Sequence, residues 1–494
     1  MKSLLIIVLY LVVIIAICTY YIKVQERKHA IKEDNFALGG RSLSTPVVGI
    51  TIALTGLGAI HVFGLMEMGF IMGYHAAWFI IGQGVLMVVV CLFTGPLVRK
   101  YECASMAELV SHVFGEKMRL LVGAATCGVI WGFMTLEAQG LGIVFNAFTG
   151  QSIALGIFLG AIVSILYVLL AGVKEIGYVN VVNTVIMFIG VILGVILLGL
   201  ALPGGSWDFV NNFFQSSPET AVMQSIVGIP SLAWTFGLSL AVAVVFSQSM
   251  NQNLLHTCAS AKSPWTIRKA VWIVVIINCT FGAFTIAMGM AAKSLPEIAA
   301  LGPKVGATKM LIEMLPPWAL LLLLASFVAA IVSSYAMVAL GIATVFTKDV
   351  YVPRFKPNAS EREQVILIRV LIIVLAFSAA FVGIFLPNIL AALGWISSFL
   401  APVFFLFVYG LFWKRSEPAA VITVLVAWIV NMLWTFTSLP EALGMPHDIN
   451  AYVTISIAIV LGAILTAVMP GKPSFVKTYK HQPLSSSSVE SSNQ

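Results

Sequence analysis

The sequence predicts an all-α protein that crosses a lipid bilayer many times, because apolar stretches long enough to span a membrane recur along the whole chain. Of its 494 residues, 60% are hydrophobic and 10% are charged, whereas about a quarter are charged in soluble domains. The mean hydropathy is +1.02. Each span needs about 20 apolar residues, and stretches of that length occur from residue 3 to residue 469. Soluble fold classes are therefore excluded.

The apolar stretches predict thirteen transmembrane helices. The first lacks a small-residue cleavage site, so it is interpreted as a helix and not as a signal peptide. A polar, serine-rich segment after the last helix cannot bury a core, and it is predicted to be disordered. The predicted spans are 3–22, 46–72, 76–97, 118–147, 152–171, 178–202, 226–252, 267–292, 317–346, 365–386, 388–412, 418–438 and 450–469.

The distribution of basic residues predicts the orientation of these helices. An odd number of spans puts the two termini on opposite sides of the bilayer. With the N-terminus outside, only four of the 27 Lys and Arg residues fall outside, namely Lys2, Lys293, Lys304 and Lys309. Positive charge collects in cytoplasmic loops. We therefore expect a multi-pass protein of the cell (inner) membrane with its N-terminus outside and its C-terminus in the cytoplasm.

Two predicted helices carry small and polar residues near mid-membrane. The helix at 46–72 contains Thr55-Gly56-Leu57-Gly58, and the helix at 226–252 contains Ser247-Gln248-Ser249, followed by Asn251 and Gln252. Segments of this kind are unwound in transporters built from inverted repeats. The alternative is that the small residues only permit close helix packing. Five helices per repeat would leave one helix before the two repeats and two after them.

Adjacent hydroxyls lie at the centre of the helix at 317–346, in Ala330-Ile331-Val332-Ser333-Ser334. Together with carbonyls released by a broken neighbouring helix, they would form an oxygen cage suited to a hard cation such as Na⁺. The alternative is that each hydroxyl bonds to the carbonyls of its own helix.

The sequence lacks the features that are typical of enzymes and of nucleic-acid-binding proteins. It contains no phosphate-binding glycine loop, no His-Glu-x-x-His motif and no nucleophile elbow, so we do not expect an enzyme. Its basic residues are scattered among short loops, which is not typical of nucleic-acid binding. The expected partners are a small solute and the lipid bilayer, with no nucleic acid and no obligate protein partner.

Four groups of motifs, in order along the chain, are shared with one family of transporters. They are Asn35 to Leu43, Asn251-Gln252 with Ala261-Lys262-Ser263, Ala329 to Ser334 followed by Lys348-Asp349-Val350-Tyr351, and Pro402 to Arg415. With these motifs the sequence resembles the sodium:solute symporter family, which includes bacterial proline, pantothenate, sialic acid and sugar transporters.

The resemblance implies a leucine-transporter-type core of two inverted repeats of five helices each. The predicted organisation is an extra helix and loop at 1–44, a transport core at 45–412 with repeats at 45–203 and 222–412, two further helices at 413–469, and a disordered tail at 470–494.

The resemblance also implies a sodium site and its ligands. Na⁺ would be held by the carbonyls of Leu54, Leu57 and Ala330 and by the hydroxyls of Ser333 and Ser334. Gly56 stands where members often have Asp or Asn, and Asn180 stands where many have Asp. Without these carboxylates the site is neutral, so we expect at most one sodium ion per cycle.

Further polar residues at membrane depth are candidates for binding the solute or for coupling. His61, Ser247, Gln248 and Asn278 fall where members of the family contact or gate their substrates; the alternative is a structural role for each. The acids Glu67 and Glu137 would serve as proton relays, and Asn180 would have a coupling role. The alternative is that Glu67 lies close to the outer boundary of its helix and that Glu137, with Gln139, pins its helix to neighbouring ones.

We therefore expect Na⁺-coupled symport of a small organic solute into the cell by alternating access. A proton-coupled symporter or a facilitator of the same fold is the first alternative, motivated by Gly56 and Asn180. A membrane sensor that binds a solute without moving it is an alternative of another class.

Overall fold

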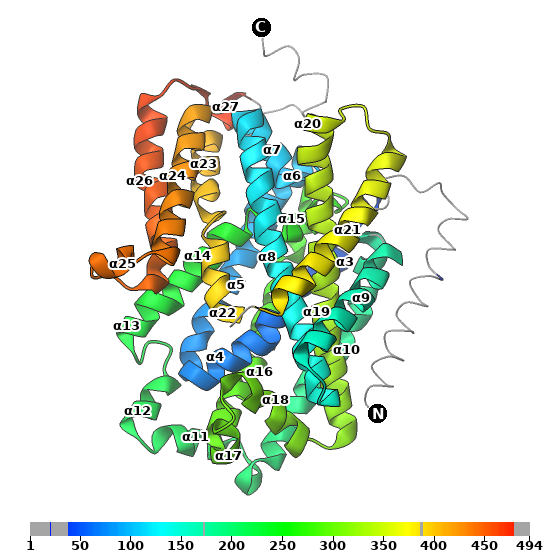
Figure 1. Ribbon diagram of the computed structural model, residues 1–494, viewed down its shortest axis with the longest axis vertical. Coiled ribbons are helices and arrows are strands. Elements are labelled where there is room, and N and C mark those ends of the chain that lie inside the picture. The colour runs from blue at the N-terminus through cyan, green and yellow to red at the C-terminus, as the bar shows by residue number, and fades with distance from the viewer. Residues whose placement is uncertain (1–19, 21–37, 171–172, 386–388, 479–494) are drawn as a thin grey trace.

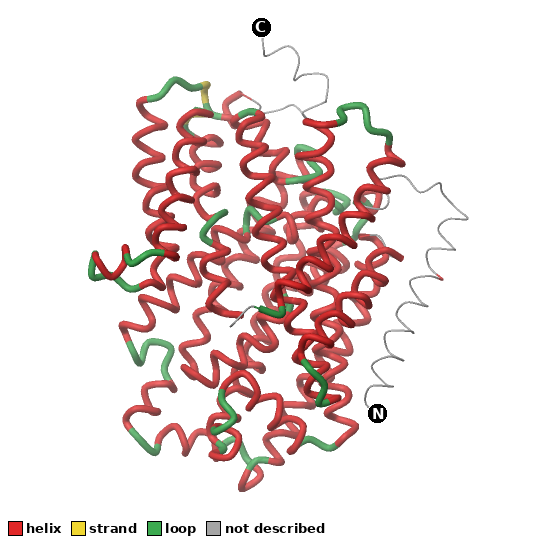
Figure 2. Tube along the Cα trace, viewed as in Figure 1, coloured by secondary structure: helices red, strands yellow, loops and turns green. Residues whose placement is uncertain are grey.

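The apolar stretches form helices that run between two ends of the molecule (Figure 1). The computed structural model describes residues 20, 38–170, 173–385 and 389–478. Loops gather mainly at the two ends, and short loops in the middle mark interrupted helices (Figure 2). Figure 1 places α7, α20 and α27 at one end, here called the inner end, and α11, α12 and α17 at the other, the outer end.

The first group of helices covers the predicted spans from 46–72 to 178–202. It consists of α3 (Thr45–Gly56), α4 (Leu65–Met72), α5 (Ala77–Val89), α6 (Gly95–Lys100), α7 (Met106–Phe114), α8 (Glu116–Thr149), α9 (Ile153–Leu170) and α10 (Val173–Ala201). Two π-helical turns, Ile60–Gly64 and Val90–Thr94, join α3 to α4 and α5 to α6, respectively.

The second group covers the predicted spans from 226–252 to 388–412, with short helices on the outer side. It consists of α11 (Asp208–Gln215), α12 (Pro218–Ala221), α13 (Pro230–Leu232), α14 (Ser239–Gln248), α15 (Gln252–Ala259), α16 (Pro264–Ser294), α17 (Pro296–Ala299), α18 (Pro303–Met314), α19 (Pro317–Val345), α20 (Val352–Phe355), α21 (Glu361–Gly383), α22 (Ile389–Ser397) and α23 (Ala401–Phe412). Further π-helical turns are Ala233–Leu238 and Phe346–Tyr351.

The C-terminal part comprises two long helices and a small two-stranded sheet. Its elements are β1 (Lys414–Arg415), α24 (Glu417–Phe436), α25 (Leu439–Ala442), α26 (Asn450–Val468), β2 (Lys472–Pro473) and α27 (Phe475–Thr478). The two strands pair antiparallel.

In the described residues, nine helices are long and apolar enough to cross a membrane, or ten if the bent pair that ends in α15 counts as one span. The predicted span 3–22 lies outside the described residues apart from Tyr20, so the count of thirteen is not confirmed. Large apolar side chains are exposed on the surface of the bundle, such as Ile429 at 59% and Val468 at 79%. Such a surface is stable in contact with lipid, and the chain is a multi-pass membrane protein. The predicted domain boundaries inside the bundle stay a prediction.

Helix α19 forms the centre of the bundle. In the continuous helical stretch Pro317–Phe355, 83% of the most apolar window is buried, against 28% for α21 and 33% for α26. It packs against α3, α8, α10 and α21. The predicted serine pair at its middle is therefore surrounded by protein and not by lipid.

The first predicted break is confirmed in the helix at 46–72. α3 ends at Gly56, Leu57 has non-helical angles (φ −95°, ψ 69°), and helical structure resumes at Ala59. Gly58 lies in the gap, and a Cβ there would collide with the carboxylate of Glu137. Only glycine fits at this position without displacing that side chain.

The second predicted break is also confirmed. The helix that ends at Gln248 and the next, α15, are bent by 41° relative to each other. The side-chain oxygen of Asn251 accepts a hydrogen bond from the backbone N–H of Asn253 and so caps the N-terminus of α15. The polar residues after Gln248 therefore end one helix and begin another.

The prediction of a disordered tail from residue 470 is wrong as far as Thr478. Phe475 is fully buried and packs edge-on against the Tyr101 ring at 5.2 Å between centroids. Nε of Arg415 donates to the carbonyl of Pro473 (2.7 Å). One buried aromatic ring and strand pairing thus order a segment whose composition is mostly polar. Residues 479–494 of the predicted tail lie outside the described residues.

We expect Phe475→Ala to destabilise the protein by about 3 kcal/mol, because it leaves a cavity where a fully buried ring was. The measurement is the apparent Tm of the detergent-purified protein. Val476→Ala is the matched control, since Val476 is 36% exposed. Equal Tm values for the two variants would contradict the buried anchor.

Candidate functional site

The serine pair of α19 lies against the break that follows α3. Ser333 and Ser334 are buried. The hydroxyl of Ser334 lies 3.1 Å from the carbonyl oxygen of Thr55, in the last turn of α3. The two predicted carbonyl ligands on the broken helix, Leu54 and Leu57, lie on either side of Thr55 in the chain, and the N–H of Leu57 donates to the carbonyl of Leu54 (3.1 Å). The structure therefore brings the hydroxyl of Ser334 and the broken helix together.

Ala330 completes the group of predicted sodium ligands. It is fully buried and lies one helical turn before Ser334 on α19. All five predicted ligands are thus on two elements, α3 with its break and α19, which pack against each other.

Helix α10 contributes amides to the same region. Nδ2 of Asn183 donates to Oγ of Ser333 (3.0 Å), a contact that sequence reasoning missed. Asn180 precedes it by three residues, and the two therefore share a helix face. The side chain of Asn180 is fully buried, and neither of its polar atoms has a hydrogen-bond partner among the described residues. In the sequence, the spacing of three residues between Asn180 and Asn183 was the feature that indicated two amides on one helix face.

Glu137 reaches the break from α8. Its Oε2 accepts the backbone N–H of Ala59 (2.7 Å), the first residue after the gap. Its Oε1 lies 3.2 Å from the hydroxyl of Ser334. One carboxylate thus contacts both the broken helix and the serine pair. Glu67, the other predicted acid, is buried in α4, beyond the π-helical turn that follows the break.

A cavity lies beside the break. Three predicted residues, His61, Glu137 and Gln248, line it, together with Gln83 and Asn253, which sequence reasoning missed. The full lining consists of Gly56, Gly58, Ile60, His61, Phe79, Gln83, Leu86, Phe133, Glu137, Gln248, Asn253, Leu254 and Leu393. Both broken helices contribute to it, so the two breaks meet at one cavity.

The predicted substrate residues differ in how they relate to this cavity. His61 stacks edge-on against Phe79 (5.2 Å), and its two ring nitrogens have no hydrogen-bond partner among the described residues. Oε1 of Gln248 accepts from Nδ2 of Asn251 (3.2 Å). A polar side chain at a cavity wall with unused hydrogen-bonding groups is available to a ligand.

Asn278 and Ser247 are not among the residues that line the cavity. Nδ2 of Asn278 donates to the carbonyl of Ala53 at 3.3 Å and to that of Val274 at 3.1 Å. It thereby joins α16 to α3 just before the break. Ser247 is fully buried in α14, and its hydroxyl has no partner among the described residues.

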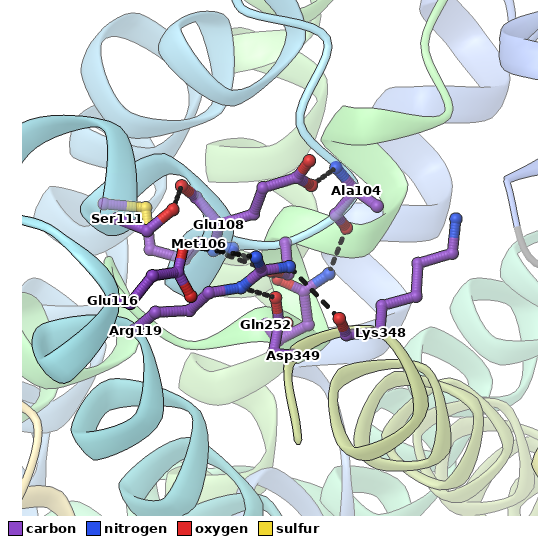
Figure 3. Close-up of polar contacts among 10 residues, drawn as sticks. Ala104, Met106, Glu108, Ser111, Glu116, Arg119, Gln252, Lys348 and Asp349 are labelled. Carbon is purple, nitrogen blue, oxygen red and sulfur yellow. Dashed lines mark hydrogen bonds and ion pairs between the residues drawn. The ribbon is translucent and has the colours of Figure 1, made fainter. Parts of the chain in front are cut away.

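A network of polar contacts joins four segments at the inner end of the bundle (Figure 3). Nε of Arg119 in α8 donates to Oδ1 of Asp349 (3.0 Å), and Nη2 donates to the carbonyl of Lys348 (3.1 Å). Asp349 is fully buried. This ion pair ties the beginning of α8 to the π-helical turn that follows α19.

Gln252, the first residue of α15, extends the network. Its Nε2 donates to the carbonyl of Ala104 (2.8 Å), and its Oε1 accepts the N–H of Met106 (3.0 Å). Figure 3 shows these bonds next to the ion pair. The second half of a broken helix is thereby attached to the segment that leads into α7. Sequence reasoning identified Gln252 and Asp349 within motifs and did not place them in one network.

Comparison with solved structures agrees with this architecture. A Na⁺-coupled sialic acid symporter, solved in a substrate-bound outward-open state, superposes with a TM-score of 0.80 at 18% identity, covering 96% of this chain and 99% of that one. Mhp1, a nucleobase-cation-symport-1 family transporter, gives a TM-score of 0.52 at 15% identity, covering 86% and 92%. The likeness concerns the fold, and the expected leucine-transporter-type architecture is confirmed.

Relatives in sequence extend over most of the chain. The osmoregulated proline transporter OpuE of Bacillus subtilis is 25% identical, covering 90% of this chain and 91% of that protein. Sodium/glucose cotransporter 1 of Oryctolagus cuniculus is 23% identical (83% and 68%), and a monocarboxylic acid transporter of Corynebacterium glutamicum is 24% identical (93% and 91%). The model of the sodium:solute symporter family matches residues 36–427. The chain therefore belongs to the sodium:solute symporter family, in which transport of a solute is coupled to Na⁺.

Proposed function

We propose that this protein carries a small organic solute together with Na⁺ into the cell by alternating access. The observation that supports this most directly is the position of the Ser333–Ser334 pair, buried at the centre of the bundle against the break after α3. The solute would occupy the cavity that residues of that break help to line. Symport needs the two sites to communicate, and the broken helix is the element that they share.

The predicted sodium ligands have the chemistry that Na⁺ requires. Carbonyl and hydroxyl oxygens are hard donors that suit hard cations. Leu54, Leu57 and Ala330 offer carbonyls, and the serine pair offers hydroxyls. The 3.1 Å contact between the hydroxyl of Ser334 and the carbonyl of Thr55 supports this assignment, because Thr55 lies between Leu54 and Leu57 in the chain. Na⁺ here is cargo that the protein binds and releases in each cycle.

The cavity favours a solute recognised through hydrogen bonds. Its polar lining consists of His61, Gln83, Gln248 and Asn253 with the carboxylate of Glu137, and no Lys or Arg lines it among the described residues. Leu86, Phe79 and Phe133 supply apolar walls. The relatives carry solutes as different as proline and glucose according to their names, so the proposal names a small organic solute and no single compound.

Coupling follows from the shared helix. Sodium binding between the break and α19 would fix the carbonyls around Leu57, and His61 lies only four residues further along the same chain. A fixed break thereby completes the cavity wall. Each ligand then stabilises the state that the other prefers, and the effect is mutual.

The network at the inner end would keep the cavity closed on that side. Because positive charge predicts this end to be cytoplasmic, we assign the Arg119–Asp349 pair and the Gln252 contacts to an inner gate. Opening toward the cytoplasm requires α15 to separate from the segment before α7.

We further propose a location in the cell membrane, with no obligate protein partner and no catalytic reaction.

We expect NaCl to raise the apparent Tm of the purified protein by about 3 °C relative to choline chloride at equal ionic strength, because a ligand that binds the native state stabilises it. Ser333→Ala removes one oxygen of the site and should require about tenfold more Na⁺ for the same shift. A solute library screened in both salts then identifies the substrate. A hit that is indifferent to Na⁺ and to Ser333→Ala would favour the proton-coupled or facilitator alternative.

A counterflow assay with the solute identified in this way distinguishes a transporter from a sensor. Labelled solute should exchange across proteoliposome membranes in a counterflow assay. Binding without counterflow would contradict transport and support the sensor alternative.

For the cavity, we expect Gln248→Leu to raise the solute concentration for half-maximal uptake about tenfold, because a hydrogen bond of about 1 kcal/mol or more is lost to a side chain of similar volume. Measurement is by solute uptake at saturating Na⁺. Gln151→Leu is the control, since Gln151 is exposed. An unchanged half-maximal concentration would remove Gln248 from the binding site.

For the gate, we expect Asp349→Asn to favour opening at the inner end by about 2 kcal/mol. This is less than the cost of breaking a fully buried pair, because the side chain of Arg119 is 17% exposed. The measurement is the rate of maleimide labelling at Cys103, which is 1% exposed at the same end, followed by peptide mass spectrometry. Lys356→Met is the control, since it breaks an exposed pair with Glu363. Equal labelling rates in the two variants would argue against a gate.

A further inference from the structure

Glu137 holds a position that the proposed sodium site does not account for. It comes from α8, whereas the five proposed ligands come from α3 with its break and from α19. Its two carboxylate oxygens have different partners: the N–H of Ala59 at 2.7 Å and the hydroxyl of Ser334 at 3.2 Å. The side chain is buried. This carboxylate is therefore in contact with a proposed ligand and with the residue that restarts the broken helix.

Both of these partners are neutral. A buried carboxylate is costly unless a cation or strong hydrogen bonds compensate it, and an amide with one hydroxyl compensates it only in part. The proposed cage of three carbonyls and two hydroxyls is neutral as well, so on its own it attracts a cation weakly. A carboxyl group that is costly to ionise where it is buried and a neutral cation site next to it complement each other, because a bound cation would stabilise the ionised form.

Other positions around the site do not supply this charge. Residue 56 is Gly, and residue 180 is Asn. The side chain of Asn183, which contacts Ser333, is a neutral amide. Glu137 is an acid whose side chain contacts the serine pair, through the hydroxyl of Ser334.

We propose that Glu137 supplies the negative charge of the sodium site and positions the hydroxyl of Ser334 for sodium binding. This inference rests on the proposed function. Ser334 has one hydroxyl proton, which it can donate either to the carbonyl of Thr55 (3.1 Å) or to Oε1 of Glu137 (3.2 Å). When the proton points to the carboxylate, the lone pairs of the hydroxyl face the break. Glu137 thus acts through Ser334, as outer ligands of metal sites do.

The backbone is built to admit this carboxylate. A Cβ at Gly58 would collide with both oxygens of Glu137, so the gap in the helix is also the space that the side chain fills. The N–H of Ala59 then orients the carboxylate from the other side. The break therefore serves two purposes: it exposes carbonyls, and it lets a charge from α8 approach them.

Glu137 also connects the two proposed sites. It lines the cavity together with His61 and Gln248, while its Oε1 contacts a proposed sodium ligand. If this side chain moves when sodium binds, the shape of the cavity wall changes with it. Glu137 is accordingly a positioning residue for sodium and a physical link in the coupling of sodium to solute.

The test compares Glu137→Gln and Glu137→Asp by sodium-dependent thermal stabilisation of the full-length, detergent-purified protein, with choline chloride as the reference. Gln keeps the shape and an acceptor oxygen but removes the charge, whereas Asp keeps the charge on a shorter side chain. We expect Glu137→Gln to raise the Na⁺ concentration for half-maximal stabilisation about 10- to 100-fold. Glu137→Asp should remain closer to the wild type than Gln does.

A second-site variant separates charge from shape. Asn180→Asp, added to Glu137→Gln, changes one buried amide with unpartnered atoms into a carboxylate of the same size on the α10 face that contacts Ser333. We expect it to recover at least part of the lost sodium response. An effect on stability alone would lower the Tm in both salts and leave the Na⁺ concentration for half-maximal stabilisation unchanged. Glu313→Gln, at an exposed acid of α18, is the control for removing any one negative charge.

The outcomes distinguish this inference from the proposed function. If the wild type shows no sodium response, the proposed function fails. If the wild type responds, Ser333→Ala needs more Na⁺ for the same response and Glu137→Gln keeps the wild-type half-maximal Na⁺ concentration, the sodium site stands and the role of Glu137 is overturned. Equal losses in Glu137→Gln and Glu137→Asp, with no recovery by Asn180→Asp, would likewise overturn the charge role.

Discussion

The interruption of the helix between Gly56 and Ala59 is the constraint on which the rest of the site depends. A bilayer offers no water to backbone groups, so non-helical backbone at membrane depth is tolerated only where protein or a cavity satisfies it. Here α8 and α19 provide that environment: Glu137 accepts the N–H of Ala59, and Ser334 contacts the carbonyl of Thr55. The two side chains that satisfy the interrupted backbone, those of Glu137 and Ser334, are also the ones assigned to the proposed sodium site.

Burial of α19 follows from the same requirement. A helix that carries two adjacent hydroxyls and packs against a broken neighbour must be enclosed by other helices, and α19 is the most buried of the candidate spans. α8 and α10 then each bring one polar side chain to the serine pair, Glu137 and Asn183. At the inner end, α8 also contributes Arg119 to the network with Asp349. One long helix thus contacts both the proposed sodium site and the proposed gate.

Much of the fold could be predicted from the sequence, because in a membrane the length of an apolar stretch and the position of small or polar residues within it carry most of the information. Both interruptions, at Leu57 and after Gln248, were predicted from local composition. The ordered structure of residues 470–478 was not predicted, because it depends on one ring, Phe475, that is buried by a distant part of the chain. Polarity of a segment does not reveal which single side chain finds a partner.

The sequence by itself determined the membrane class, the helices, the family resemblance and the residue types available for a cation, because these depend on composition and on near neighbours in the chain. Only the tertiary structure decided which polar residues meet. Glu137 was a candidate acid in the sequence, and 197 residues separate it from Ser334; Asn183 and Ser333 are 150 residues apart. Contacts over such separations are set by helix packing, and a pattern along one helix does not specify the face of another.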